Sequence, residues 1–276
     1  MVKDKIKREL IKSLLKQRKP FSNKGDYGHA LIIAGQKGYM GAAVIAAKAA
    51  LRSGAGLLTI SVPSCERFIL QIAVPEAMIT IREEIEPTVD KFSAAGVGPG
   101  LGTDKNSEEL LLLLLRDFKK PILLDADALN MISANKQLLS KIPAGTIITP
   151  HTIEFDRLFG THENNLDRID TAVKKAKELN IVIVLKGHET AVISYDKILY
   201  NTTGNAGLAK GGSGDALTGV ITSFLAQGYS PVDACIIGVY LHGLAADLSL
   251  KKQSMESMLI TDVINHFGNA FKEIRK

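Results

Sequence analysis

The feature that most constrains the fold is a regular alternation of short apolar segments with segments of helical periodicity. It begins with HALIIAG at 29–35, GAAVIAAKAALRSG at 41–54 and LLTISVP at 57–63. Short strands that are apolar on both faces are typical of a parallel sheet covered by helices on both sides. The sequence therefore predicts an α/β fold, a three-layer αβα sandwich with a mostly parallel central sheet. Further strand candidates lie at 77–81, 92–98, 121–127, 145–151, 181–187 and 190–196.

No linker rich in Pro or Ser and no internal repeat divides the rest of the chain, so one domain over 21–276 is expected. Residues 196–207 are predicted to form an irregular crossover, and apolar helices at about 231–249 and 260–271 to close the fold. The run LLLLLR at 111–116 suits a buried helix. No apolar run approaches the roughly 18 residues that a membrane helix needs, so no membrane partner is expected.

The formal net charge of +5 is concentrated at the start of the chain. Residues 1–19 hold eight Lys or Arg against Asp4 and Glu9, while the remainder is close to neutral, so no nucleic-acid partner is expected. We predict a basic amphipathic N-terminal helix over 1–20, packed on the domain or on a neighbouring subunit. A nucleic-acid or membrane arm is the alternative. The apolar face of this helix would comprise Ile6, Leu10, Ile11, Leu14 and Leu15.

The chain has two cysteines, Cys65 and Cys235, which are too few for a disulfide scaffold and match no metal spacing. Its first residues are charged, with no apolar signal core behind them. Both features favour a reducing compartment, and we expect a cytoplasmic protein.

The segment NTTGNAGLAKGGSGDALTG at 201–219 joins a loop of small residues to the start of a helix. Gly212 and Gly214 lack the Cβ atoms that would keep a phosphate away from the backbone, and Ser213 adds a hydroxyl. From Asp215 onward apolar residues recur at three- and four-residue spacing, so the helix begins where the glycines end, and its positive dipole end faces the same anion. The N–H groups of Gly212 to Asp215 are predicted to bind an oxyanion.

Asp215 lies at this junction, where an acidic residue is often only an N-cap. A carboxylate beside a phosphate site repels the ligand, so it needs a role there, such as taking a proton from an attacking hydroxyl or holding a metal. Other phosphate-binding motifs are excluded. Lys210 precedes the glycine pair, contrary to a P-loop, and Pro99 among the alternating glycines of 96–102 does not fit the dinucleotide-binding fingerprint.

Polar and glycine-rich residues follow most of the predicted strands. Ligands of parallel α/β sheets bind at the carboxyl ends of the strands, so these segments predict one composite site. Among them, Asp125, Asp127 and Asn130 are a candidate Mg²⁺ site, because Mg²⁺ binds mainly through water and substrate phosphates with few protein oxygens. Asp127 suits a cap of the next helix equally well, and no metal ligand is assigned. The segments are 35–41, 98–102, 125–130, 149–154 and 186–190.

Seven motifs occur in this order: GHALIIAG, YMGAAVIAAKAALRSGAGL, GVGPGLG, LDADALN, TPHTIEF, LKGHET and NTTGNAGLAKGGSGDALTG. Over residues 21–270 the chain thereby resembles the ADP-dependent NAD(P)H-hydrate dehydratases of the ribokinase-like superfamily. The resemblance implies a ribokinase-like fold and a hydro-lyase that repairs NADH hydrate and NADPH hydrate. Water added across the nicotinamide C5–C6 bond would be removed at the cost of ADP hydrolysis to AMP and phosphate.

The resemblance also implies cofactors and partners. ADP or ATP would be the co-substrate, Mg²⁺ the cofactor, and the assembly a homotetramer. The family also occurs fused to an NAD(P)H-hydrate epimerase. This chain has no room for that half, so a separate epimerase would act with it.

By the same resemblance, Asp215 would be the base beside the hydrate hydroxyl, while Gly212, Ser213 and Gly214 hold the transferring phosphoryl group. Lys210 would offset charge near the phosphates without being a ligand. The residues that bind the hydrate would be Ala42, Ala43, Gly102, His151 and Asp215. The residues that bind the nucleotide would be Lys186, Gly187, His188, Glu189, Thr190, Asn205 and Gly214.

Structural roles are the alternatives for several of these residues. Ala42 and Ala43 suit tight packing of a helix on the sheet, Gly102 suits a turn, and Lys186 suits a solvated strand end. His151 follows a rigid proline at a strand end, and its place in the TPH motif favours a functional role. The Pro-Gly that the family usually has after this His is replaced by Thr-Ile, which affects the shape of the loop more than the role of His151.

Two other functions compete with this one. A small-molecule kinase of the same fold, phosphorylating a vitamin-like alcohol with ATP, would use the same arrangement around Asp215. A catalytically silent nucleotide sensor would have no need of a base after Gly212-Ser213-Gly214.

Overall fold

The computed structural model describes residues 4–84 and 89–276, and within them nine strands form one sheet in the order β3-β2-β1-β4-β5-β6-β7-β8-β9. β1 to β7 are parallel, and β8 and β9 add two antiparallel strands at one edge. The mostly parallel sheet is confirmed, while β9 corrects the irregular crossover expected over 196–207. The strands are β1 (His29–Ile33), β2 (Leu57–Val62), β3 (Met78–Ile81), β4 (Ala94–Val97), β5 (Ile122–Leu124), β6 (Ile147–Ile148), β7 (Val182–Leu185), β8 (Ala191–Ile193) and β9 (Ile198–Tyr200).

Side chains alternate between two apolar cores along the strands. In β1, Ala30 and Ile32 lie in one core, and Leu31 and Ile33 lie in the other. Because successive side chains of a strand point to opposite faces, a strand covered on both faces is apolar at every position. This is why the strands could be recognised as continuous apolar runs.

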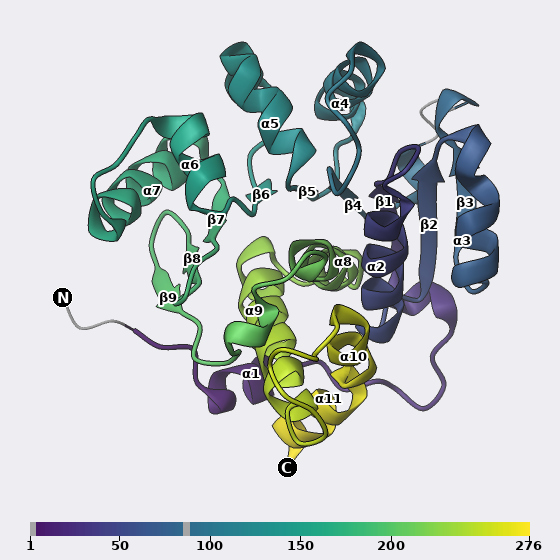
Figure 1. The fold of residues 1–276 in the computed structure, drawn as a ribbon, viewed down its shortest axis with the longest axis vertical. Coiled ribbons are helices and arrows are strands. Elements are labelled where there is room, and N and C mark those ends of the chain that lie inside the picture. Colours follow the sequence, from purple (N-terminus) through teal and green to yellow (C-terminus); the bar gives the residue numbers. More distant parts are fainter. Residues whose placement is uncertain (1–3, 85–88) are drawn as a thin grey trace.

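Helices cover both faces of the sheet, with α4 to α7 along one side of the row of strands and α8 and α9 along the other (Figure 1). One core is shared by α1 (Arg8–Leu14), α2 (Met40–Arg52), α3 (Arg67–Ala73), α8 (Ser213–Ala226), α9 (Pro231–Ser249), α10 (Ile260–Asn265) and α11 (Phe267–Arg275). The other is shared by α4 (Lys105–Asp117), α5 (Asp127–Ala134), α6 (Thr152–Phe159) and α7 (Asn165–Leu179). The three-layer αβα architecture is thus confirmed. Short 3-10 turns lie at 24–27, 64–66, 82–84, 89–91, 136–141 and 206–208.

α2 and α8 lie close together because small residues line their contact. A Cβ added at Gly219 of α8 would lie 2.1 Å from the carbonyl oxygen of Ala46 in α2, so this position requires glycine. Ala43 and Ala50 of α2 are fully buried. This packing fixes α8 so that its N-terminus lies at the carboxyl ends of β5 and β7, beside Asp125 and Lys186.

α9 is long and apolar enough to cross a membrane by length and composition alone, but 72% of its most apolar stretch is buried. It packs against α8, α10 and α11, as a core helix does. The helix predicted over 260–271 is two helices, α10 and α11, which meet at His266. The run at 111–116 lies in α4 and contributes buried leucines to the core, as expected.

The N-terminal segment differs from the helix predicted over 1–20. Helix α1 is seven residues long, and Lys5 before it pairs with Tyr200 of β9. Ile6 and Ile11 are fully buried, and α1 packs on α9 and α11 of the same chain. Within the predicted apolar face, Ile6 and Ile11 are thus buried in the subunit, while Leu10, Leu14 and Leu15 are half-buried against the same core. Residues 1–3 of the prediction lie outside the described residues.

Candidate active site

Helix α8 begins at Ser213, directly after Gly212, whose φ is +92°. A Cβ at Gly212 would lie 2.7 Å from Cδ1 of Ile45, so both the backbone angle and the packing favour glycine. The first N–H groups of a helix have no acceptor within it, and Gly212 has no side chain to cap them. The N–H groups of Gly214 and Asp215 are therefore available to an anion.

Two groups of the preceding loop are used differently from the prediction. The N–H of Ser213, expected to face the anion, donates to the carbonyl oxygen of Lys210 at 3.3 Å. The Lys210 ammonium donates to the carbonyl oxygens of Glu256 and Met258. Lys210 therefore ties the loop to the segment before α10, and its charge is not directed at the phosphate position.

A buried ion pair joins two strand ends beside the start of α8. Lys186, after β7, donates to Oδ1 of Asp125, after β5, at 2.8 Å and lies 3.9 Å from Oε2 of Glu154. Thr218, in α8, donates to Oδ2 of Asp125 at 2.8 Å. Burial opposes the charge on Lys186, but the carboxylates of Asp125 and Glu154 outweigh it and hold the pKa of Lys186 above its ordinary value. Lys186 thus remains a cation and is not the solvated strand end considered above.

Gly214 brings this ion pair and the helix start together. A Cβ at Gly214 would lie 3.4 Å from Nζ of Lys186 and 3.6 Å from Oδ2 of Asp125. An anion at the available N–H groups would therefore meet the Lys186 ammonium as well, and a charged donor strengthens such a contact. The glycines leave space for that anion.

Asp215 lies in the first turn of α8 and is half-buried. The pKa of Asp215 is raised to about 6, mainly by burial. The carboxylates of Asp125 and Asp127 also raise this pKa, whereas Lys186 lowers it. Such a carboxyl is still mostly ionised at neutral pH, yet accepts a proton more readily than an ordinary Asp. The N-cap position belongs to Gly212, so Asp215 is not the N-cap that its sequence position also suggested.

A hollow of about 350 Å³ lies next to Asp127. Gly102 has a φ of +82°, and its N–H donates to Oδ2 of Asp127 at 2.9 Å, so it forms the turn that the structural alternative required. Ala126, between the two aspartates, has an unusual φ of +45°, a strained conformation of the kind found at functional sites. The hollow is lined by Gln36, Tyr39, Gly102, Thr103, Asp104 and Asp127.

The residues proposed for Mg²⁺ are already engaged with protein groups. Asp125 accepts from Lys186 and Thr218, while Asp127 accepts from Asn130 at 3.3 Å. In the part of the chain that the structure describes, no group of three or more His, Cys, Asp or Glu side chains is arranged to hold a metal. The carboxylates beside the helix start instead fit Mg²⁺ that is carried by nucleotide phosphates and water.

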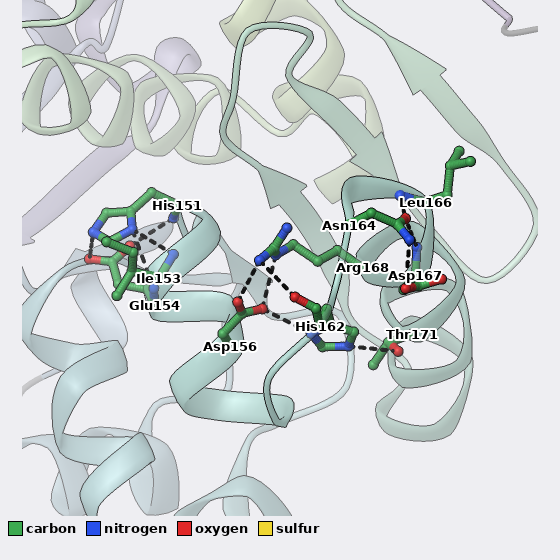
Figure 2. Close-up of polar contacts among 10 residues, drawn as sticks. All are labelled: His151, Ile153, Glu154, Asp156, His162, Asn164, Leu166, Asp167, Arg168 and Thr171. Atoms are coloured by element: carbon green, nitrogen blue, oxygen red, sulfur yellow. Dashed lines mark hydrogen bonds and ion pairs between the residues drawn. The ribbon is translucent and has the colours of Figure 1, made fainter.

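His151 follows β6 and caps α6, as Figure 2 shows. The ring Nδ1 of His151 accepts from the backbone N–H groups of Ile153 and Glu154. The backbone N–H of His151 donates to Oε2 of Glu154 at 2.8 Å. Nδ1 therefore carries no proton, and Nε2, 3.5 Å from Oε1 of Glu154, is the protonated nitrogen. The side chain is 48% exposed, so the cap leaves one edge of the ring open to solvent.

A second cluster in Figure 2 fixes α6 against α7. Arg168 of α7 makes two hydrogen bonds to the carboxylate of Asp156 in α6, at 2.6 and 3.0 Å, and His162 lies 2.8 Å from the same carboxylate. The hydrogen bonds from Arg168 are the main reason that the pKa of Asp156 is lowered. The cluster holds the helix that His151 caps but does not reach Asp215.

Two of the residues implied for hydrate binding lie in α2, with different surroundings. Ala43 is fully buried, and a Cβ added at Gly35 would lie 3.0 Å from its methyl group, which favours the packing role. Ala42 is only half-buried and lies beside Gly100 at the rim of the site.

The residues implied for nucleotide binding are brought together only in part. Gly187, His188 and Glu189 form an exposed turn after Lys186, and the hydroxyl of Thr190 donates to the carbonyl oxygen of Gly187. Asn205 caps a 3-10 turn. Its side-chain NH₂ donates to Asp247 at 3.0 Å, and its side-chain oxygen accepts from the N–H of Gly207. The side chain of Asn205 is thus committed to the loop that leads to Gly212.

Thr218 is a residue of this site that sequence analysis did not identify. It lies in α8 among apolar residues, is fully buried, and is 93 positions from its partner Asp125. A hydroxyl at that position also suits an ordinary helix interior, so only the three-dimensional contact identifies it. Gln36 and Tyr39, beside Gly102, were likewise missed, although the segment 35–41 was predicted to border the site.

Comparison with known proteins identifies close relatives. The sequence profile of a family described as NAD(P)H-hydrate dehydratase matches residues 30–268. An ADP-dependent (S)-NAD(P)H-hydrate dehydratase of Listeria monocytogenes is 33% identical over 90% of both chains. A crystal structure of an ADP/ATP-dependent NAD(P)H-hydrate dehydratase from Bacillus subtilis, co-crystallized with ATP/Mg²⁺, matches with a TM-score of 0.89 and 33% identity over 99% of both chains.

Longer relatives match as well. A bifunctional NAD(P)H-hydrate repair enzyme of Moorella thermoacetica is 35% identical over 96% of this chain. The chain spans only 53% of that protein, about half its length.

Proposed function

Since the chain belongs to the NAD(P)H-hydrate dehydratase family, we propose that it removes water from NADH hydrate and NADPH hydrate, with ADP as the phosphoryl donor. The observation that carries this proposal is the position of Asp215. A carboxyl with a pKa of about 6 lies in the same helical turn as available N–H groups and near the Lys186 ammonium. A base next to an anion site is what transfer of a phosphoryl group to a hydroxyl requires.

In the first step, Asp215 accepts the proton of the hydrate hydroxyl while the hydroxyl oxygen bonds to the terminal phosphorus of ADP. The bond between that phosphorus and the oxygen of AMP breaks, and AMP leaves with its electron pair. The N–H groups of Gly214 and Asp215 and the Lys186 ammonium stabilise the negative charge on the transferring group. Asp125 and Thr218 hold Lys186 in place for this task.

In the second step, the phosphate ester on the ring is eliminated. The carbon–oxygen bond breaks and phosphate departs with its electrons. The departing phosphate accepts the proton that the neighbouring ring carbon loses as the double bond forms. Phosphate leaves far more easily than hydroxide, so two moderate steps replace one difficult step. The products are the repaired nicotinamide cofactor, AMP and phosphate.

The residues around this centre suggest how the substrates are divided. The hydrate ring is proposed to lie between the half-buried Ala42 and the hollow beside Gly102, with the open edge of His151 nearby. ADP is proposed to lie over the exposed turn at 187–190. Ala43 and Asn205 support the site through packing and loop geometry.

The remaining proposals concern cofactor and assembly. Mg²⁺ would neutralise phosphate charge, held by the phosphates and water beside the carboxylates of Asp215 and Asp127. We further propose a cytoplasmic homotetramer that acts together with an NAD(P)H-hydrate epimerase activity.

A coupled assay tests the proposed function. The protein is incubated with NADH hydrate and Mg²⁺ and with either ADP or ATP, and the absorbance band of NADH is followed. We expect the band to return with nucleotide and not without it. ATP-dependent phosphorylation of a vitamin-like alcohol, with no return of the NADH band, would instead assign the protein to the kinases of this fold.

A further inference from the structure

A second and larger cavity, of about 1050 Å³, lies at the opposite end of α2 and α8 from the candidate active site. α8 carries Asp215 in its first turn and ends at Ala226, next to Gln227 in the cavity wall. A helix of this length spans about 20 Å, so the cavity is remote from the chemistry. Its other walls come from the segment 15–27 and from the ends of α2 and α11.

The cavity is strongly basic. One carboxylate, that of Asp26, lines it, and this group accepts the N–H of Asn23 at 2.7 Å. The cationic side chains in its wall are Lys16, Arg18, Lys19, Arg52 and Arg275. Three of the eight basic residues in 1–19 therefore line one cavity, a use that the proposed reaction does not explain.

Two of these cations bond to backbone carbonyls at helix ends, and a third, Arg275, lies over the ring of Phe271 at 5.9 Å. Lys16 donates to the carbonyl oxygen of Gly228, and Arg18 to that of Gly54, so both neutralise helix C-termini. Among the residues that the structure describes, Lys19, Arg52 and Arg275 have no carboxylate within ion-pair distance, and all three are exposed. Three unpaired cations around one cavity attract a ligand with several negative charges.

An aromatic ring completes the cavity wall. The side chain of Phe21 is fully exposed, an unusual state for a phenylalanine. The rings of Tyr27 and Tyr229 are covered by Arg18 and Lys16, at 3.8 and 4.4 Å, but Phe21 offers a free face. Nucleobases stack on such faces.

We propose that this cavity is a second nucleotide site, in which Lys19, Arg52 and Arg275 bind the phosphates and Phe21 stacks on the base. Its volume reaches the upper end of the range of small-molecule pockets and accommodates a nucleoside diphosphate. The site is distinct from the phosphoryl-transfer centre, and the inference does not depend on the proposed reaction.

Calorimetric titration with ADP at low ionic strength tests the proposal. The parent protein is compared with the double variant Lys19→Glu/Arg52→Glu and with the control Lys174→Glu/Lys177→Glu, which makes the same charge change on the exposed face of α7. We expect the parent and the control to bind one more ADP per chain than the double variant. Because the difference in stoichiometry is measured, the result stands whether or not the first site turns over NADH hydrate. Equal stoichiometry in all three proteins overturns the proposal.

Two single variants test the phosphate contact and the base contact separately. Arg275→Glu, at the exposed last position of α11, is expected to weaken the second site. Phe21→Ala is expected to weaken ADP at this site about tenfold and to leave inorganic tripolyphosphate unchanged, because only ADP has a base to stack. Equal effects of Phe21→Ala on both probes would contradict base stacking, and no effect of Arg275→Glu would contradict the phosphate contact.

Discussion

At the scale of single residues, the proposed reaction depends on Asp215. From its position after Gly214, Asp215 could be a helix cap or a base. The structure excludes the helix cap, because Gly212 occupies the N-cap position. We predict that Asp215→Asn keeps nucleotide affinity but lowers turnover on the order of a hundredfold to ten-thousandfold, since shape is preserved and proton acceptance is lost. Steady-state rates and ADP binding, measured on the same preparations, check this. Turnover within threefold of the parent would remove Asp215 from the reaction.

The raised pKa of Asp215 also predicts a stability change with a definite sign. The folded protein holds the Asp215 proton up to about pH 6, whereas the unfolded chain releases it near the ordinary pKa of 3.8. The free energy of unfolding therefore decreases as pH rises between these two values. Asp215→Asn removes this decrease. The variant is expected to be more stable than the parent by up to about 3 kcal/mol at pH 8 and equal to it below about pH 3. Urea unfolding at both pH values measures the difference; a variant less stable at pH 8 contradicts the burial of this carboxyl.

The sequence alone identified the residues that lie next to one another in the chain, and it missed contacts between distant segments. Gly212, Gly214 and Asp215 follow from local spacing, and the structure brings them together. The pairing of Asp125 with Lys186 and with Thr218 joins positions up to 93 residues apart. Side chains that meet only after folding have no local pattern, so this part of the site required the structure.

At the element scale, apolar runs located the strands, but their limits were set by the loops of the site. The run at 121–127 supplies only Ile122–Leu124 to β5, because the chain turns at Ala126 to begin α5. β9 was missed because three residues between polar neighbours form too short a pattern. The N-terminal stripe was recognised correctly as apolar on one face, yet periodicity does not indicate which surface covers it.

The structure assigns that stripe to the fold of its own subunit, which yields a prediction for α1. Ile11→Ala is expected to lower the free energy of unfolding by about 2–5 kcal/mol, because a fully buried side chain is removed. Lys12→Ala, on the exposed side of the same helix, serves as the control and is expected to change little. Urea midpoints measure both. If Ile11→Ala alters the oligomeric mass while leaving the stability intact, α1 belongs to a subunit contact after all.

At the scale of the whole molecule, an exposed apolar surface lies at the sheet edge opposite β9. Phe68 and Ile72 of α3 and Met78 of the edge strand β3 are exposed, and large patches of this kind usually mark contacts between proteins. We predict a homo-oligomer, most simply the proposed tetramer, that uses this surface. Light scattering is expected to give a multimeric mass for the parent and a lower mass for Ile72→Glu. A monomeric parent at micromolar concentration would refute the assembly.

The stoichiometry of the reaction tests the proposed dehydration most directly. Purified protein, NADH hydrate, ADP and Mg²⁺ are mixed, and NADH, AMP and phosphate are quantified together over time. We expect the three products to appear in equal amounts and Asp215→Asn to suppress all three. Release of AMP and phosphate without NADH, or recovery of NADH without consumption of ADP, would contradict dehydration through a phosphorylated hydrate.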